Sequence, residues 1–248
     1  MLAVLLLSAS DQKAACALLE KLIAKTPHGP ERAWLGAMLA TWELDDFARR
    51  GASLKELLPE ARGDAGVSAR IAILIAGNET EAGGIASALR YGRSALVDAR
   101  ASDDAAVHAY VLTTLAHIEA YAGLPAREHL DLADGLAGEL PSPNPYRRPR
   151  FIMSLVARQA GRLEEARALL EPICEQLRDD AEVYNLSHAL PYMVDLEWRA
   201  GNWQRAADLA EEGCALSIET QTMPWQWLFA RAGRGGSRRD GGGAGACR

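Results

Sequence analysis

Apolar and charged residues between positions 163 and 177 alternate with the period of an amphipathic helix. The apolar positions step by three and four: Leu163, Ala166, Leu169, Leu170, Ile173, Cys174 and Leu177. Such spacing places one apolar stripe along a helix and leaves its opposite side charged. The stripe recurs later in the chain from Trp203 to Cys214, and an earlier copy runs from Ala126 to Ala137. The pattern therefore predicts a helical unit that repeats along the chain.

The dipeptide Ala-Gly marks the expected turn of each unit. It occurs at Ala76-Gly77, Ala122-Gly123, Ala160-Gly161 and Ala200-Gly201, each time after an apolar stretch. Glycine is favoured where a helix ends because it adopts the left-handed conformation that other residues avoid. We therefore predict helical hairpins over residues 68–100, 103–139, 147–178 and 181–219, preceded by less regular helices over 11–58.

Prolines and glycines define the expected boundaries. Residues 141–150 contain four prolines, which excludes a helix interior and predicts a stiff linker between the second and third hairpins. Pro191 falls inside a predicted helix, where we expect a kink. The whole pattern predicts an all-α fold, an α-solenoid of tetratricopeptide-like helical hairpins over residues 1–230. Residues 231–248 lack apolar periodicity and are predicted to be a disordered tail rich in glycine and arginine.

Composition supports the helical prediction and divides the charge. Alanine, the residue with the highest helix propensity, occupies 46 of the 248 positions. The net charge is −6, but residues 231–248 hold five arginines and a single aspartate, so the rest carries −10. We therefore expect no direct nucleic-acid binding by the folded part. Two interpretations of the tail stay open: a basic arm for nucleic acid, or a terminus without a role, such as an out-of-frame translation of a missing helix.

The ends of the chain bear on its location and association. The apolar run Met1–Leu7 has no basic residues before it and is too short for the core of a signal peptide. No apolar run reaches the roughly 20 residues of a membrane-spanning helix, and the four cysteines form no close pair. We expect a cytoplasmic protein that does not bind membranes. Because Met1–Leu7 and the helix predicted from Pro224 leave both ends of a solenoid uncapped, self-association through these ends is also predicted.

Three segments carry a family resemblance. They are Pro27-His-Gly-Pro-Glu-Arg-Ala33, Ala160-Gly-Arg-Leu-Glu-Glu-Ala-Arg-Ala-Leu-Leu170 and Leu196-Glu-Trp-Arg-Ala-Gly-Asn-Trp-Gln-Arg-Ala206. Over residues 10–230 the chain resembles the tetratricopeptide-like helical region of LuxR-family transcriptional regulators, the MalT-like ATP-dependent activators. In that family a nucleotide-binding domain precedes this region and a helix-turn-helix follows it. Neither the Gly-x-x-x-x-Gly-Lys-Ser/Thr loop nor a helix-turn-helix is found in this sequence, so the resemblance implies a detached, truncated segment.

Candidate catalytic and metal-binding motifs are incomplete. His117-Ile-Glu119 matches the start of the zinc-deaminase motif, but the Pro-Cys-x-x-Cys that this chemistry needs is absent. His129 lies on an apolar stripe, where a packed histidine is expected rather than a ligand. We therefore expect no enzyme activity, no metal and no cofactor.

Several other conspicuous residues have structural explanations. The acidic pairs between predicted helices are expected to cap helix N-termini; they are Asp103/Asp104 and Asp179/Asp180. Packing in the core is expected for Cys174 and Cys214, and for Trp198 and Trp203.

Two groups of residues are candidates for binding. Tyr184 and Tyr192 lie on a predicted first helix, the type that lines the concave face in tetratricopeptide stacks, and are candidates for a groove. Arg147, Arg148 and Arg150 are candidates for an anion site, although an exposed linker explains them equally well. The first hypothesis is a sensor or scaffold segment of a LuxR-type regulator that recognises a protein, a peptide or a small effector. The alternative is a free-standing tetratricopeptide-like adaptor for a peptide or partner helix.

Overall fold

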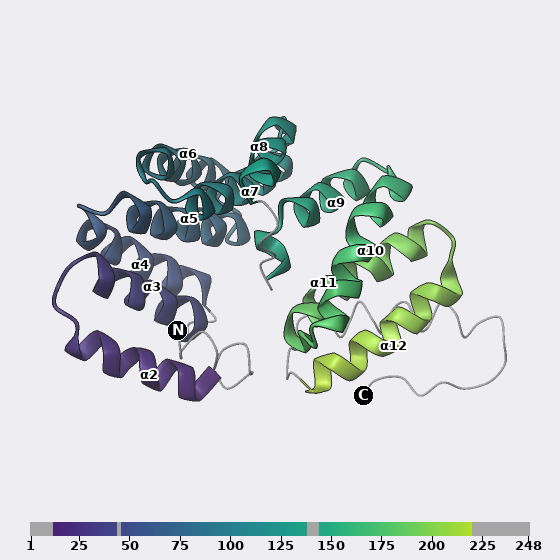
Figure 1. The fold of residues 1–248 in the computed structure, drawn as a ribbon, viewed down its shortest axis with the longest axis horizontal. Coiled ribbons are helices and arrows are strands. Elements are labelled where there is room, and N and C mark those ends of the chain that lie inside the picture. The colour runs from purple at the N-terminus through teal and green to yellow at the C-terminus, as the bar shows by residue number, and fades with distance from the viewer. Residues whose placement is uncertain (1–11, 44–45, 138–143, 220–248) are drawn as a thin grey trace. The chain divides into compact units, whose positions relative to one another are not determined.

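The computed structural model describes residues 12–43, 46–137 and 144–219, and within these ranges it contains helices and turns but no strand. This confirms the all-α prediction (Figure 1). The elements, in chain order, are α2 (Gln12–Lys25), α3 (Pro30–Glu43), α4 (Phe47–Leu57), η1 (Leu58–Ala61), α5 (Ala65–Glu81), α6 (Ile85–Ala101), α7 (Ala105–Tyr121), α8 (Arg127–Ala137), η2 (Pro145–Arg147), α9 (Pro149–Gln159), α10 (Leu163–Asp179), α11 (Val183–Arg199) and α12 (Trp203–Glu219). The predicted tail over 231–248 and the predicted uncapped ends lie outside the described residues.

The four predicted hairpins are present. They are formed by α5 with α6, α7 with α8, α9 with α10 and α11 with α12, and their ends differ from the predicted ones by at most three residues. The region 11–58 contains three helices, α2, α3 and α4, as the less regular pattern there predicts. The repeating apolar stripe was therefore sufficient to identify the unit of the fold.

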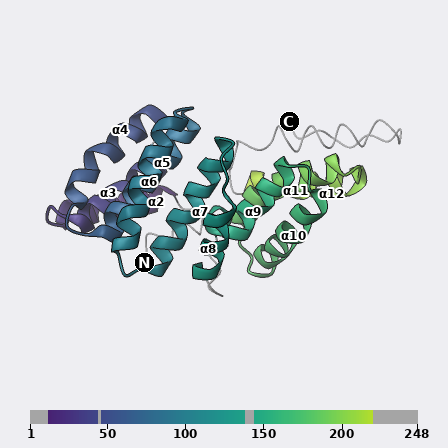
Figure 2. The same cartoon turned by 90° about the horizontal axis from the view of Figure 1, so that it is seen from above.

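The chain divides into two compact units. The first comprises residues 1–140 with 146–149, and the second comprises 141–145 with 150–248. In the first unit α5 packs on both α6 and α7, and α7 packs on α8; in the second α11 packs on α10 and α12. Figure 2 shows the helices of each unit in a view turned by 90°.

Each hairpin turn is closed by a residue in the left-handed conformation. Gly83, Gly123, Gly161 and Gly201 have φ values between +70° and +82°. The amide of the next residue then bonds back into the helix; Leu124 donates to the Glu119 carbonyl at 2.8 Å. This arrangement is the Schellman motif, which satisfies carbonyls that the helix end leaves without partners.

The first turn prediction was wrong in its position. Gly77 lies in the interior of α5, and the chain reverses at Gly83, in the second Ala-Gly pair of the same segment. A turn at residue 77 would end α5 after about three turns, and the helix continues instead to Glu81. The turn glycines Gly83, Gly123, Gly161 and Gly201 consequently follow one another after 40, 38 and 40 residues.

The connection between α10 and α11 uses alanine where the other turns use glycine. Ala181 has φ +54°, and the Glu182 amide donates to the Leu177 carbonyl at 2.9 Å, which is the same pattern of hydrogen bonds. A left-handed alanine costs about 1–2 kcal/mol. The sequence offers no glycine here, so the connection predicted between residues 178 and 181 rests on the helical periodicity on either side and not on a turn residue.

The proline-rich segment leads into α9 through a short helical turn. Residues 145–147 form the 3-10 helix η2, and α9 already begins at Pro149. Proline is compatible with the first turn of a helix because the amide there has no partner within the helix. Pro191 lies inside α11 as predicted, and Pro172 lies inside α10.

The acidic pairs have different roles. Asp104 is the N-cap of α7, and its carboxylate accepts from the amides of Ala106 and Val107 at 2.9 and 3.1 Å, so capping is confirmed there. For the other pair the prediction was wrong, because Asp179 ends α10 and Asp180 is its C-cap.

The core is built from small side chains. Alanines such as Ala76, Ala88 and Ala95 are fully buried against Leu115 in the first unit, which allows the helices to approach closely. In the second unit Cys174 and Cys214 are buried, as predicted. Trp198 and Trp203, however, are 47% and 46% exposed, which contradicts their predicted packing. They flank the α11–α12 turn, where the helix ends leave the packed interior.

Candidate interaction face

Tyr184, His188 and Tyr192 form one stripe along α11, which we call the α11 face. The spacing of four residues places the three side chains on the same side of the helix. All three are half-buried. The structure thus brings the two tyrosines predicted from the sequence onto one face and adds a histidine between them.

Tyr192 is held by two residues of α9. Its ring meets the ring of Phe151 edge-on, with centroids 5.4 Å apart and planes at 89°. The guanidinium of Arg158 lies 5.2 Å from the centroid of the same ring. Arg158 also pairs with Asp195, one turn further along α11. Tyr192 is therefore both a packing residue and a member of the face.

Tyr184 and His188 form the other end of the face. Their ring centroids lie 4.8 Å apart with tilted planes. Burial raises the pKa of Tyr184 and lowers the pKa of His188, so both rings are uncharged at neutral pH. An uncharged aromatic stripe with a phenol and an imidazole can stack on a partner and exchange hydrogen bonds with it.

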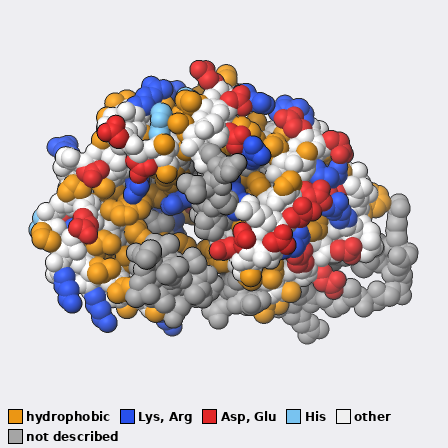
Figure 3. Space-filling model, viewed as in Figure 1, with side chains coloured by type: hydrophobic (Ala, Val, Ile, Leu, Met, Phe, Trp, Pro, Cys, Tyr) orange, Lys and Arg blue, Asp and Glu red, His pale blue; other side chains and the backbone are white. Residues whose placement is uncertain are grey.

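Arginine–glutamate pairs fix α11 between its neighbours. The side chain of Glu197 is fully buried, and its two carboxylate oxygens accept from Arg167 of α10 at 2.8 and 3.0 Å. Asn202 donates to the same carboxylate from the α11–α12 turn. Two further pairs join α10 directly to α12: Arg178 with Glu212, and Glu171 with Arg205. Figure 3 shows acidic and basic side chains interspersed over the second unit.

Opposing effects act on the pKa of Glu197. Burial raises this pKa, while hydrogen bonds from Arg167 and Asn202 and the charges of Arg167 and Arg205 lower it, leaving it below the ordinary value for glutamate. Glu197 is therefore ionised at neutral pH and the pair with Arg167 carries both charges.

Glu197 was not among the residues predicted from the sequence, although the sequence carries a signal for it. The residue four positions before the turn glycine is a glutamate in three hairpins: Glu79, Glu119 and Glu197. Glu79 pairs with Lys55 at 2.7 Å, and Glu119 lies 2.8 Å from His129. Each glutamate thus joins the end of a first helix to a basic residue of a neighbouring helix. The contact with Glu119 explains why His129 is a packed histidine, and it gives Glu119 of the incomplete deaminase motif a structural role.

The three candidate arginines occupy separate environments. The guanidinium of Arg147 lies 4.6 Å from the ring centroid of Tyr110, within the first unit. Arg148 is buried, and Arg150 is an exposed residue of α9. Arg147 and Arg148 belong to the first unit and Arg150 to the second.

The described ranges contain no group of three or more histidine, cysteine, aspartate or glutamate side chains placed to hold a metal ion. Nor is any helix in those ranges both long enough and apolar enough to cross a membrane.

The repeated hairpins define a helical-repeat protein. Its structure is similar to the crystal structure of BtubC (BKLC) from P. vanneervenii, with a TM-score of 0.58 and 15% sequence identity, covering 86% of this chain and 90% of that chain. At this identity the likeness concerns the fold alone. No protein-family model matches the sequence, and no curated protein matches it significantly.

Proposed function

We propose that this chain is a protein-interaction module of the cytoplasm, without catalytic activity, and that it binds a peptide or a partner helix on the α11 face. The observation that carries the proposal is the half-buried, uncharged stripe of Tyr184, His188 and Tyr192 on the first helix of a hairpin. Aromatic rings give a large contact area at a low cost in side-chain entropy. Anchored by α9 and by the Glu197 pairs, the stripe needs little reorganisation on binding.

A finer form of the proposal assigns the module to a LuxR-type transcriptional regulator, as the region that recognises a partner or effector. The support is the resemblance of the segments 27–33, 160–170 and 196–206. These segments lie at the α2–α3, α9–α10 and α11–α12 turns. Helical hairpins need turn residues of this kind in any protein. The resemblance is therefore weaker support for a LuxR-type regulator than the α11 face is for peptide binding.

A peptide selection tests the α11 face. Phage-displayed random peptides are panned against the full chain, the enriched peptides are synthesised, and their Kd values are measured by fluorescence anisotropy. Tyr184→Ala is expected to weaken binding by about tenfold or more, because a central aromatic anchor contributes on the order of 2 kcal/mol. Tyr121→Ala is the matched control, since Tyr121 is 59% exposed on a first helix of the other unit.

Equal Kd values for the Tyr184→Ala variant and the unaltered chain would show that peptides bind elsewhere. Tyr192→Phe rather than Tyr192→Ala is used at the second position, because the ring packs against Phe151 and its loss would disturb the fold. Circular dichroism of each variant establishes that the helices are retained.

The flanking genomic DNA tests the finer form. Coding capacity for a phosphate-binding loop upstream and for a helix-turn-helix downstream is expected for a LuxR-type regulator. Intact unrelated genes on both sides would contradict it and would favour a free-standing adaptor.

A further inference from the structure

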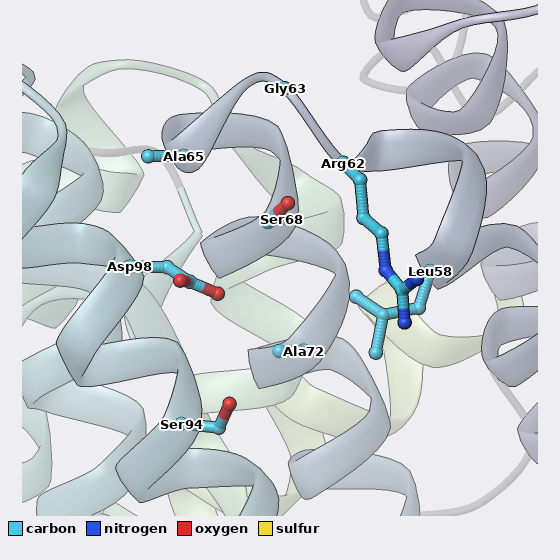
Figure 4. Close-up of a pocket in the computed structure, with 8 residues that line it drawn as sticks. All are labelled: Leu58, Arg62, Gly63, Ala65, Ser68, Ala72, Ser94 and Asp98. Atoms are coloured by element: carbon cyan, nitrogen blue, oxygen red, sulfur yellow. The ribbon is translucent and has the colours of Figure 1, made fainter.

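A pocket of about 500 Å³ lies in the first unit, between η1 and the helices α5 and α6. Its walls include Leu58, Arg62, Ser68, Ala72, Ser94 and Asp98. Figure 4 shows Ser94 and Asp98 on the α6 side and Arg62 on the η1 side, with α5 between them. Arg62 and Ser94 are exposed residues, so the pocket is open to solvent.

Asp98 is not explained by the stability of the fold. Its carboxylate has no hydrogen bond or ion pair with any described residue, and burial raises its pKa. It also lies in the last turn of α6, where the helix dipole disfavours a negative charge. A carboxylate in this position gains most from a cation that enters the pocket.

Arg62 provides the opposite charge. It follows η1, and its guanidinium forms no ion pair or hydrogen bond with the described residues. A guanidinium presents paired donors that match the two oxygens of a carboxylate. The pocket therefore presents one negative and one positive group, neither of which is neutralised by a described residue.

We propose that this pocket binds a short peptide through its two free termini, with the ammonium at Asp98 and the carboxylate at Arg62. Asp98 lies on α6 and Arg62 follows η1, so the negative and the positive group belong to different elements of the pocket wall, and a ligand with one charge at each end complements them. Extended dipeptides and tripeptides reach about 7 and 10 Å, and their charges lie at the termini. Leu58 and Ala65, both partly exposed, provide apolar surface for a small side chain between them.

The test is isothermal titration calorimetry of the full chain with Ala-Leu and Ala-Leu-Ala. N-acetylated and C-terminally amidated forms of each peptide lack one charge. We expect at least one free peptide to bind, and each blocked form to bind about tenfold more weakly.

Variants assign each terminus to its residue. Asp98→Asn is expected to abolish the advantage of the free ammonium without affecting that of the free carboxylate, and Arg62→Gln is expected to do the reverse. Asp103→Asn and Arg49→Gln, at exposed positions of the same unit, are matched controls and should leave binding unchanged.

Three results would overturn the proposal. They are no heat of binding for either free peptide at millimolar concentration, equal binding of free and blocked peptides, and equal effects of the pocket variants and their controls. None of these results bears on the α11 face, whose residues belong to the other unit.

Discussion

At the residue scale, the carboxylates before the turns join neighbouring helices in a chain whose core is rich in alanine. Glu79, Glu119 and Glu197 occupy the same place in three hairpins and pair with Lys55, His129 and Arg167. Small apolar contacts alone leave helices free to slide, whereas an ion pair with fixed geometry favours one register. The fully buried Glu197 is the member whose loss should be felt most.

Glu197→Gln is expected to lower the free energy of unfolding by about 2–3 kcal/mol at pH 7, because charge-assisted hydrogen bonds to Arg167 and Asn202 are weakened. The folded pKa of Glu197 is lowered, so its contribution is present above the ordinary pKa of glutamate and is lost as the pH falls through the folded value. The difference between variant and unaltered chain should be constant above about pH 5.5 and shrink below about pH 4.5.

Urea unfolding followed by circular dichroism between pH 3.5 and 7 measures this difference. Glu211→Gln, at an exposed position of the same helix pair, is the control and should have no effect. A Glu197→Gln effect that does not change with pH would contradict the ionised pair.

At the scale of elements, each hairpin combines an apolar stripe with a left-handed turn residue. The stripe is readable from spacing alone, and this is why the four hairpins were predicted nearly to their ends. The turn is less readable, because Ala-Gly occurs both inside α5 at Gly77 and at its end at Gly83. Ala181 adopts the same conformation without being glycine. Local sequence thus leaves the exact turn open, and the packing of the paired helices selects it.

Two glycine-to-alanine variants test the corrected turn. Gly83→Ala should destabilise the protein by about 1–2 kcal/mol, because φ is +82° there. Gly77→Ala should stabilise it by about 0.5–1 kcal/mol, because Gly77 is helical and an added Cβ would meet nothing within 4 Å.

The measurement is urea unfolding of both variants under one set of conditions. The two substitutions are chemically identical and six residues apart, so each is the control for the other. The two changes in the free energy of unfolding are expected to have opposite signs. A destabilising Gly77→Ala together with a stabilising Gly83→Ala would indicate that the turn lies at Gly77.

At the scale of the whole molecule, the fold is a helical repeat that many sequences can encode. The similarity to BtubC at 15% identity illustrates this, because hairpins need a pattern of small apolar residues rather than particular ones. Charge is the other property of the whole chain: residues 1–230 are acidic, while the five arginines of 231–248 are not balanced locally.

The charge distribution gives a prediction about nucleic acid. In a gel-shift assay at 0.15 M salt, any binding of duplex DNA by the full chain should disappear when the five arginines after residue 230 are replaced by glutamine. The control replaces the same five tail arginines by lysine, which keeps the positive charge and should preserve any binding. Arginines of the folded part are not suitable as a control, because those of α10 and α12 form ion pairs that the change to glutamine would disrupt. Binding that persists in the glutamine variant would contradict the expectation for residues 1–230.

The all-α class, the hairpin repeat and the stripe of Tyr184 and Tyr192 could be predicted without the structure, because they follow from the 3.6-residue period of a helix. Which charged residues meet could not be predicted, because it depends on how the helices pack. Arg167 and Glu197, thirty residues apart, form an ion pair, and Arg62 and Asp98, 36 residues apart, line one pocket; no local pattern in the sequence marks either pair. The same reason explains the exposed Trp198 and Trp203: burial depends on which helix packs next to a residue, and periodicity reports only the side on which it lies.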